Sequence, residues 1–181
     1  MRCVALLRGI NVSGRKIAPM TELRRAFESL SFKNVRTYAQ SGNVIFDCKR
    51  AETVKIAQCV EEKLRETFGF STNVLIRTQR ELKRIIENNP LIDSADVVGP
   101  DKLYVTFLSD GPDETVASNL DIKLDQGEKF VIAGKEVYLY CPNGYAGTKL
   151  NNAMFETKLK TVATTRNWKT INKLLVISKS S

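Results

Sequence analysis

The loop from Arg8 to Lys16 holds the residue types of an anion-binding site. Its sequence, Arg8-Gly9-Ile10-Asn11-Val12-Ser13-Gly14-Arg15-Lys16, contains three cations, an asparagine and two glycines. Glycines let main-chain N–H groups turn toward an anion, and arginine and lysine supply positive charge. We therefore predict that Arg8, Asn11, Arg15 and Lys16 bind an anion. The alternative is a surface loop in which the glycines only turn the chain.

The same loop comes close to the Walker A pattern of nucleotide-binding P-loops, G-x-x-x-x-G-K-[ST]. Arg15 stands where that pattern has its phosphate-binding lysine, and Lys16 where it has the hydroxyl that binds Mg²⁺. Ile17 and Ala18 then separate the loop from Pro19, which suits a first helical position. These differences argue against a P-loop NTPase and leave a looser, cation-based anion site.

A second loop repeats this composition near the C-terminus. Asn143-Gly144-Tyr145-Ala146-Gly147-Thr148-Lys149 has glycines followed by a hydroxyl and a cation. Further small polar residues surround Asn43, in the turn Ser41-Gly42-Asn43, and Arg166, in Thr164-Thr165-Arg166-Asn167. We add Asn43, Thr148, Lys149 and Arg166 to the predicted anion-binding set. The simpler alternative is that Thr148 and one of the threonines before Arg166 cap helices.

Two other classes of site are disfavoured by composition. The chain has no histidine, so the usual base of hydrolases and the commonest metal-binding side chain are both missing. Cys3, Cys48, Cys59 and Cys141 are scattered and form no C-x-x-C pair. We predict no metal site and no cofactor, and the sequence identifies no catalytic residue.

The positive charge is concentrated at the two ends of the chain. The net charge is +8, with +7 in residues 1–50 and +6 in residues 141–181, against −1 in 51–100 and −4 in 101–140. If the ends meet in space, they form one basic face. No apolar run approaches the ~20 residues of a membrane span, and no signal peptide is recognisable. We therefore expect a cytoplasmic protein that does not associate with a membrane.

Hydrophobic periodicity predicts the elements that position these loops. In residues 1–78 it indicates strands at 3–7, 35–40, 43–48 and 73–77, and helices at 19–30 and 54–68. This order, β-α-β-β-α-β, predicts an antiparallel sheet with two helices on one face. Residues 79–181 form the second predicted domain. In it we expect a helix at 79–88, a repeated β-α-β-β order over residues 101–141, and helices at 148–160 and 166–175.

Four segments resemble a bacterial family of unknown function. Residues 8–14 and 37–46 resemble the RGINVGG and TYIQSGNVVF motifs of that family, and residues 147–150 and 163–168 are similar to its SKL and ATTRNW segments. Ser13, Ala39 and Thr148 depart from those motifs. The resemblance implies an α+β fold with two ferredoxin-like halves, each with an antiparallel sheet, the second followed by a C-terminal helix. It implies no activity.

Three functions fit these observations, and whether the protein is an enzyme stays open, as does its oligomeric state. The first is binding of a polyanion such as nucleic acid through a basic face built from both chain ends. The second is an enzyme or sensor that holds one small phosphorylated metabolite between the cations of the two loops. The third is a protein-interaction module whose motifs fix turns and caps. A steep loss of affinity with salt would separate the first from the second.

Overall fold

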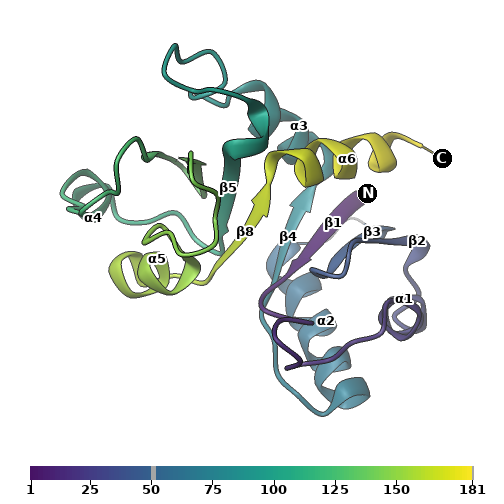
Figure 1. The fold of residues 1–181 in the computed structure, drawn as a ribbon. Coiled ribbons are helices and arrows are strands. Elements are labelled where there is room, and N and C mark those ends of the chain that lie inside the picture. The colour runs from purple at the N-terminus through teal and green to yellow at the C-terminus, as the bar shows by residue number, and fades with distance from the viewer. Residues whose placement is uncertain (50–51, 181) are drawn as a thin grey trace. The chain divides into compact units, whose positions relative to one another are not determined.

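The computed structural model describes residues 1–49 and 52–180, which form two compact units. The first unit contains the described residues of 1–84 together with 173–180, and the second unit contains residues 85–172. Figure 1 shows the elements of both units along the chain. In this part of the chain, no helix combines the length and the apolar character needed to cross a membrane.

The first unit is built on a four-stranded antiparallel sheet, as predicted. Its elements are β1 (Arg2–Leu7), α1 (Met20–Ser29), β2 (Lys33–Tyr38), β3 (Asn43–Asp47), α2 (Thr53–Phe68) and β4 (Val74–Thr78). The strand order is β2-β3-β1-β4, so β1, which is apolar from Cys3 to Leu7, lies inside the sheet. In this register Ala5 of β1 lies between Val44 of β3 and Ile76 of β4.

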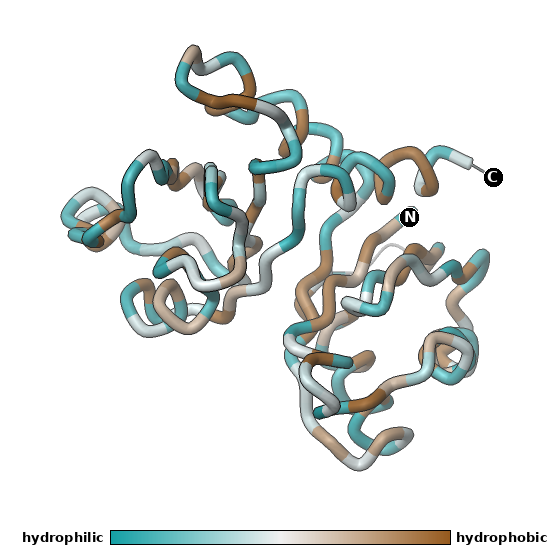
Figure 2. The backbone as a smooth tube through the Cα atoms, viewed as in Figure 1, coloured by the Kyte–Doolittle hydropathy of each residue, from teal (hydrophilic) through white to brown (hydrophobic). Residues whose placement is uncertain are grey.

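The two helices cover one face of this sheet. Leu23 and Phe27 of α1 and Val60 and Leu64 of α2 are buried against alternate residues of β1, including Ala5. Figure 2 shows that most residues of β1 itself are hydrophobic. Helix α2 ends at Gly69, which has a φ of +73°, a left-handed conformation that glycine adopts without steric cost.

The second unit repeats this architecture. It contains η1 (Pro100–Lys102), β5 (Leu103–Leu108), α4 (Glu114–Ser118), β6 (Lys129–Ala133), β7 (Glu136–Tyr140), α5 (Asn152–Leu159) and β8 (Ala163–Asn167). The strand order, β6-β7-β5-β8, matches that of the first sheet, and every pair is antiparallel. Two ferredoxin-like halves with antiparallel sheets were predicted, and this α+β fold is confirmed.

A helix follows the last strand of each half. Helix α3 (Gln79–Glu87) follows β4, and α6 (Trp168–Lys179) follows β8. Residues 173–180 of the chain belong to the first unit, where Arg2 of β1 donates hydrogen bonds to the carbonyl oxygens of Ser178 and Ser180. In the second unit, the hydroxyl of Tyr138 donates to the carbonyl oxygen of Ile85 over 3.0 Å.

The alternative that Thr148 and a threonine before Arg166 cap the last two helices is wrong. Helix α5 begins at Asn152 rather than at 148, and the Asn151 side chain caps it by accepting from the N–H of Met154. Helix α6 begins at Trp168, and the side chain of Asn167 accepts from the N–H of Thr170 over 2.7 Å. Asparagine is as good an N-cap as serine or threonine, so residue type alone did not distinguish the candidates.

Candidate functional site

The loop that follows β1 is a tight hairpin. The N–H of Arg15 donates to the carbonyl oxygen of Val12 over 2.9 Å, and the N–H of Asn11 donates to that of Lys16 over 3.1 Å. The turn residues Ser13 and Gly14 both have positive φ, +50° and +72°, as a type I′ turn requires. Val12, Arg15 and Lys16 are consequently exposed around the tip of the hairpin.

The side chain of Asn11 holds this hairpin in place through three hydrogen bonds to the main chain. Its side-chain Oδ1 accepts from the N–H of Ala18 over 2.8 Å, and its Nδ2 donates to the carbonyl oxygens of Ala18 and Gln40, each over 3.0 Å. Both N–H groups of the amide therefore serve main-chain carbonyls. In this structure Asn11 holds the loop and the neighbouring β2–β3 turn together.

The β2–β3 turn is closed by Asn43, the second predicted asparagine. Asn43 is fully buried, and its Nδ2 donates to the carbonyl oxygen of Tyr38 over 2.9 Å and to Ser41 Oγ over 3.0 Å. Gly42 beside it has a φ of +75° and lies against Ile10 so closely that a Cβ would be 2.7 Å from Ile10 Cδ1. The glycine of this motif is thus needed for both conformation and packing.

The start of β4 completes this edge of the sheet. Lys16 Nζ donates to the carbonyl oxygen of Ser71 over 2.7 Å, and Thr72 Oγ1 donates to that of Arg8 over 2.6 Å. The N–H of Arg8 donates to the carbonyl oxygen of Asn73 over 2.9 Å. We call the segments 8–16, 39–43 and 71–73 the loop edge. Five of the predicted residues lie on it: Arg8, Asn11, Arg15, Lys16 and Asn43.

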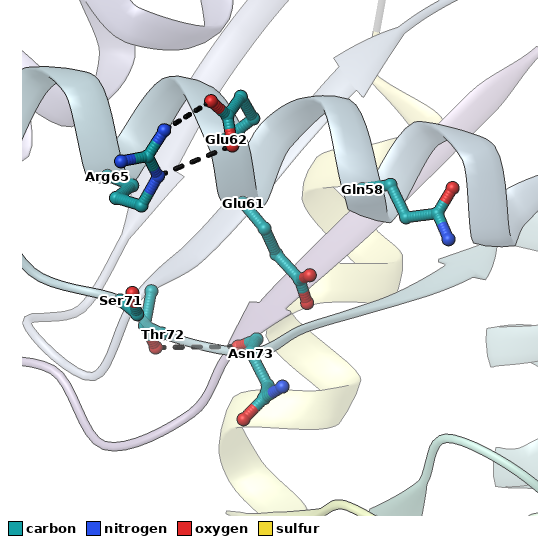
Figure 3. A pocket seen from close by; sticks show the side chains of 7 residues that line it. All are labelled: Gln58, Glu61, Glu62, Arg65, Ser71, Thr72 and Asn73. Carbon is teal, nitrogen blue, oxygen red and sulfur yellow. Dashed lines mark hydrogen bonds and ion pairs between the residues drawn. The ribbon is translucent and has the colours of Figure 1, made fainter.

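A pocket of about 400 Å³ adjoins the loop edge, between α2 and the start of β4. Its lining is polar and consists of Gln58, Glu61, Glu62, Arg65, Ser71, Thr72 and Asn73 (Figure 3). The sequence analysis did not identify it. Charged residues such as Glu61, Glu62 and Arg65 are normal on the exposed side of a helix, so they gave no signal of a pocket. Only the fold places them beside residues 71–73.

The charges in this pocket argue against an isolated phosphate as its ligand. Glu61 Oε1 accepts from the N–H of Val74 over 2.8 Å, and Glu62 forms an ion pair with Arg65. The hydrogen bond and the charge of Arg65 lower the pKa of Glu62, so this carboxyl is held ionised. The lining thus carries two acidic side chains and one basic side chain.

In the second unit, Thr148 and Lys149 are tied to the segment 125–128. Thr148 is buried and donates its hydroxyl hydrogen to Glu128 Oε1, while Glu128 Oε2 accepts from the N–H of Asp125 over 3.0 Å. Lys149 Nζ lies 3.2 Å from Asp125 Oδ1, and both side chains are about half exposed. Acidic partners 20 or more residues away give no local signal in the sequence.

Arg166 is buried on β8, opposite Val105 of β5. Its Nη1 donates to Thr164 Oγ1 over 2.8 Å and to the carbonyl oxygen of Thr165 over 2.9 Å. The first sheet has a counterpart, Arg77, which is buried on β4 opposite Val4 of β1. The buried arginine is therefore a feature of both halves.

The hydroxyl of Thr165 connects β8 to the second glycine-containing loop. It donates to Asn152 Oδ1 over 2.7 Å, accepts from the Tyr145 hydroxyl over 3.0 Å and lies 2.7 Å from Thr106 Oγ1. The ring of Tyr145 also packs on Tyr104, with centroids 5.2 Å apart. These contacts, which the sequence analysis did not anticipate, fix the loop in its own unit.

The two units differ strongly in charge. Residues 1–84 and 173–181 contain 19 Lys and Arg against 8 Asp and Glu, a net charge of +11. Residues 85–172 contain 9 against 12, a net charge of −3. Among the residues that the structure describes, no group of three or more His, Cys, Asp or Glu side chains could hold a metal ion.

Comparison with known proteins finds a matching family and a similar solved structure. Residues 1–138 match a family described as Protein of unknown function (DUF1697). A solved structure of a conserved bacterial protein from Streptococcus pneumoniae has a TM-score of 0.76 and is 21% identical over 98% of this chain and 98% of that chain. At this identity the likeness extends to the fold alone. None of the curated proteins matches the sequence.

Proposed function

We propose that the first unit binds a polyanion such as nucleic acid. The chain belongs to DUF1697, a family of proteins of unknown function. The observation that carries this proposal is the division of charge. A net charge of +11 on one unit, beside −3 on the other, is the electrostatic pattern of a protein that binds a polyanion. A protein selected only for solubility has no need of such a difference.

The loop edge is the part of the first unit where we expect phosphates to bind. Arg15 and Lys16 are exposed at the hairpin tip, and the hydrogen bonds of Asn11 hold that hairpin in one conformation. Lys16 donates one hydrogen bond to Ser71, and an ammonium group has two further N–H donors. A preformed loop loses less conformational entropy on binding than a mobile one.

The adjoining pocket favours a polyanion over a small phosphorylated metabolite. A metabolite that entered the pocket would place its phosphate close to Glu61 and Glu62. A chain of phosphates lying across the hairpin tip instead meets the cations outside the pocket. We therefore rank polyanion binding first and expect Arg15 and Lys16 to contribute more to it than Arg65, which is paired with Glu62.

Fluorescence anisotropy with labelled single- and double-stranded oligonucleotides tests this proposal. We expect binding at low salt, with log K falling against log [salt] by about 0.7 to 0.9 for each phosphate contacted. Arg15→Ala should weaken binding and reduce the slope by about one contact. Lys158→Ala removes the same charge from an exposed site on α5 of the second unit and should leave binding unchanged.

Two results would contradict the proposal. One is the absence of binding to either oligonucleotide at low salt. The other is equal weakening by Arg15→Ala and Lys158→Ala, because attraction to net charge alone would then explain the affinity and no phosphate would be bound at the loop edge.

A further inference from the structure

Two of the four cysteines lie side by side at the end of the first sheet opposite the β2–β3 turn. Cys3 Sγ is 3.8 Å from Cys48 Sγ. Cys3 pairs with Phe46 in the β1–β3 ladder, and Cys48 follows the last residue of β3. The main chain fixes this position, because the N–H of Cys48 donates to the carbonyl oxygen of Met1 over 3.0 Å and the terminal ammonium donates to that of Cys48 over 2.6 Å.

The two thiols differ in their access to solvent. Cys3 is completely buried, whereas Cys48 is half-buried at the rim of the core. Burial raises the pKa of Cys3, and the neighbouring Cys48 raises it further. A reagent in solution therefore meets Cys48 first, and Cys3 can react only with a group already attached to Cys48 or next to it.

We propose that Cys3 and Cys48 are a redox pair that forms a reversible intramolecular disulfide, with a small-molecule disulfide of the glutathione class as oxidant. A disulfide needs its sulfurs about 2.0 Å apart, so the two sulfurs must approach by roughly 1.8 Å. Cys48 lies just beyond β3, so rotation of its side chain need not disturb the paired residues of that strand.

The reaction is a two-step exchange. The Cys48 thiolate attacks one sulfur of the oxidant, forms a mixed disulfide and releases one thiolate. Cys3 then attacks the Cys48 sulfur, which forms the Cys3–Cys48 bond and releases the second thiolate, and this departing thiolate takes up the Cys3 proton. Two protein thiols are oxidised and one small disulfide is reduced to two thiols. The raised pKa of Cys3 makes the second step the slower one.

The bond would join β1 to β3 beside the contact that holds the C-terminal residues. Arg2 donates to Asp47 Oδ2 over 3.2 Å and to the carbonyl oxygens of Ser178 and Ser180. A crosslink between residues 3 and 48 closes a loop that contains α1 and β2. It therefore restricts the unfolded chain, and the oxidised protein should melt at a higher temperature than the reduced protein.

Oxidation of the full-length protein tests the pair. The chain is incubated with oxidised glutathione, remaining thiols are alkylated, and peptides are mapped by mass spectrometry. We expect a crosslinked peptide with Cys3 and Cys48, a higher melting temperature, and reversal of both by dithiothreitol. Cys59→Ser removes an exposed cysteine of α2 and should leave the crosslink intact, whereas Cys48→Ser should abolish it.

A second variant gives an answer if Cys48→Ser does not fold. The double variant Cys59→Ser with Cys141→Ser leaves Cys3 and Cys48 as the two remaining thiols. We expect the crosslinked peptide in this variant, and its absence overturns the proposal. The proposal is overturned if Cys48 ends as a stable mixed disulfide with glutathione while Cys3 stays reduced. It is overturned equally if the crosslinks connect two chains.

Discussion

Asn11 Nδ2 lies 3.0 Å from the carbonyl oxygen of Gln40, and this bond joins the first loop to the β2–β3 turn. The same side chain forms two hydrogen bonds with the main chain of Ala18. Asn11 itself has a φ of +53°, in the left-handed region where asparagine is tolerated better than most residues. One asparagine thus sets both the closure of the loop and its position on the sheet.

Replacing Asn11 with alanine should destabilise the protein. The variant loses three hydrogen bonds and places alanine at positive φ, so we expect the free energy of unfolding to fall by about 1–3 kcal/mol. Urea denaturation measures this change. Asn34→Ala is the matched control, because Asn34 has a φ of +52° but its side chain donates a single exposed hydrogen bond to Asp47. Equal losses in the two variants would mean that the Asn11 bonds contribute little.

Gly42→Ala should destabilise the protein through a steric clash. A Cβ at this position would lie 2.7 Å from Ile10 Cδ1 and 2.9 Å from Leu7 Cβ, both of which are buried. We expect a loss of about 2–4 kcal/mol, which combines backbone strain and overpacking.

Gly134→Ala separates those two causes. Gly134 also has positive φ, +62°, but nothing lies within 4 Å of its added Cβ. The free energy of unfolding of the Gly134→Ala variant should therefore fall by about 1 kcal/mol, from backbone strain alone. Thermal and chemical denaturation of the two variants side by side checks the difference. A Gly42→Ala protein no less stable than Gly134→Ala would show that Ile10 moves aside without cost.

The alternation and clustering of apolar residues were enough to predict most of the fold. The β-α-β-β order predicted for residues 101–141 includes β5 (Leu103–Leu108) and β7 (Glu136–Tyr140), because both carry strand-forming side chains bounded by turn residues. Strand β8 was not predicted as a strand. Its sequence, Ala163-Thr164-Thr165-Arg166-Asn167, has no apolar alternation, and the strand is held by β5 and by the hydroxyl contacts of Thr165.

The loop edge could be predicted only in part. Glycines and cations indicated the first loop, and its position between the β2–β3 turn and β4 follows from the predicted strand order. The roles of individual side chains could not be derived. Asn11 binds the main chain of Gln40, and Thr148 binds Glu128, because the fold brings distant residues next to them. Asn43 instead binds Tyr38 within its own turn. Residue type is the same in a cap, a turn and an anion site.

The stability of the protein should fall at alkaline pH in a way that depends on Cys141. Burial raises the pKa of the Cys141 thiol from 9.0 to about 11. The folded state therefore keeps this proton over a pH range in which the unfolded chain loses it. Linkage then requires the free energy of unfolding to decrease as pH rises from 9.0 to about 11 and to be unaffected by this group below that range.

Urea denaturation of wild type and Cys141→Ala at several pH values isolates this contribution. Below pH 9.0 the two curves should differ by a constant amount, and from there to about pH 11 the variant should lose stability less steeply. Cys3 is also buried with a raised pKa, so some slope should persist in the variant. Parallel curves over the whole range would contradict the prediction.

Replacing Arg15 or Lys149 with alanine should weaken polyanion binding if both glycine-containing loops contact the polyanion. Each lies in a segment that precedes a helix, and each is exposed, so neither replacement should change the melting temperature appreciably. Lys149 also pairs with Asp125 at 3.2 Å, and its removal leaves an exposed carboxylate that would repel phosphate. If both loops contact the polyanion, each variant should reduce the salt slope by about one contact.

Oligonucleotide binding by the single variants and the double variant distinguishes contact with both loops from contact with the first unit alone. If both loops contact the polyanion, the double variant loses about two contacts in the salt slope, while Lys158→Ala, which removes one exposed cation from α5, stays like wild type. If Arg15→Ala weakens binding and Lys149→Ala does not, the polyanion contacts the first unit alone. That outcome would agree with the net charges of +11 and −3 on the two units and would remove Thr148, Lys149 and Arg166 from the binding set.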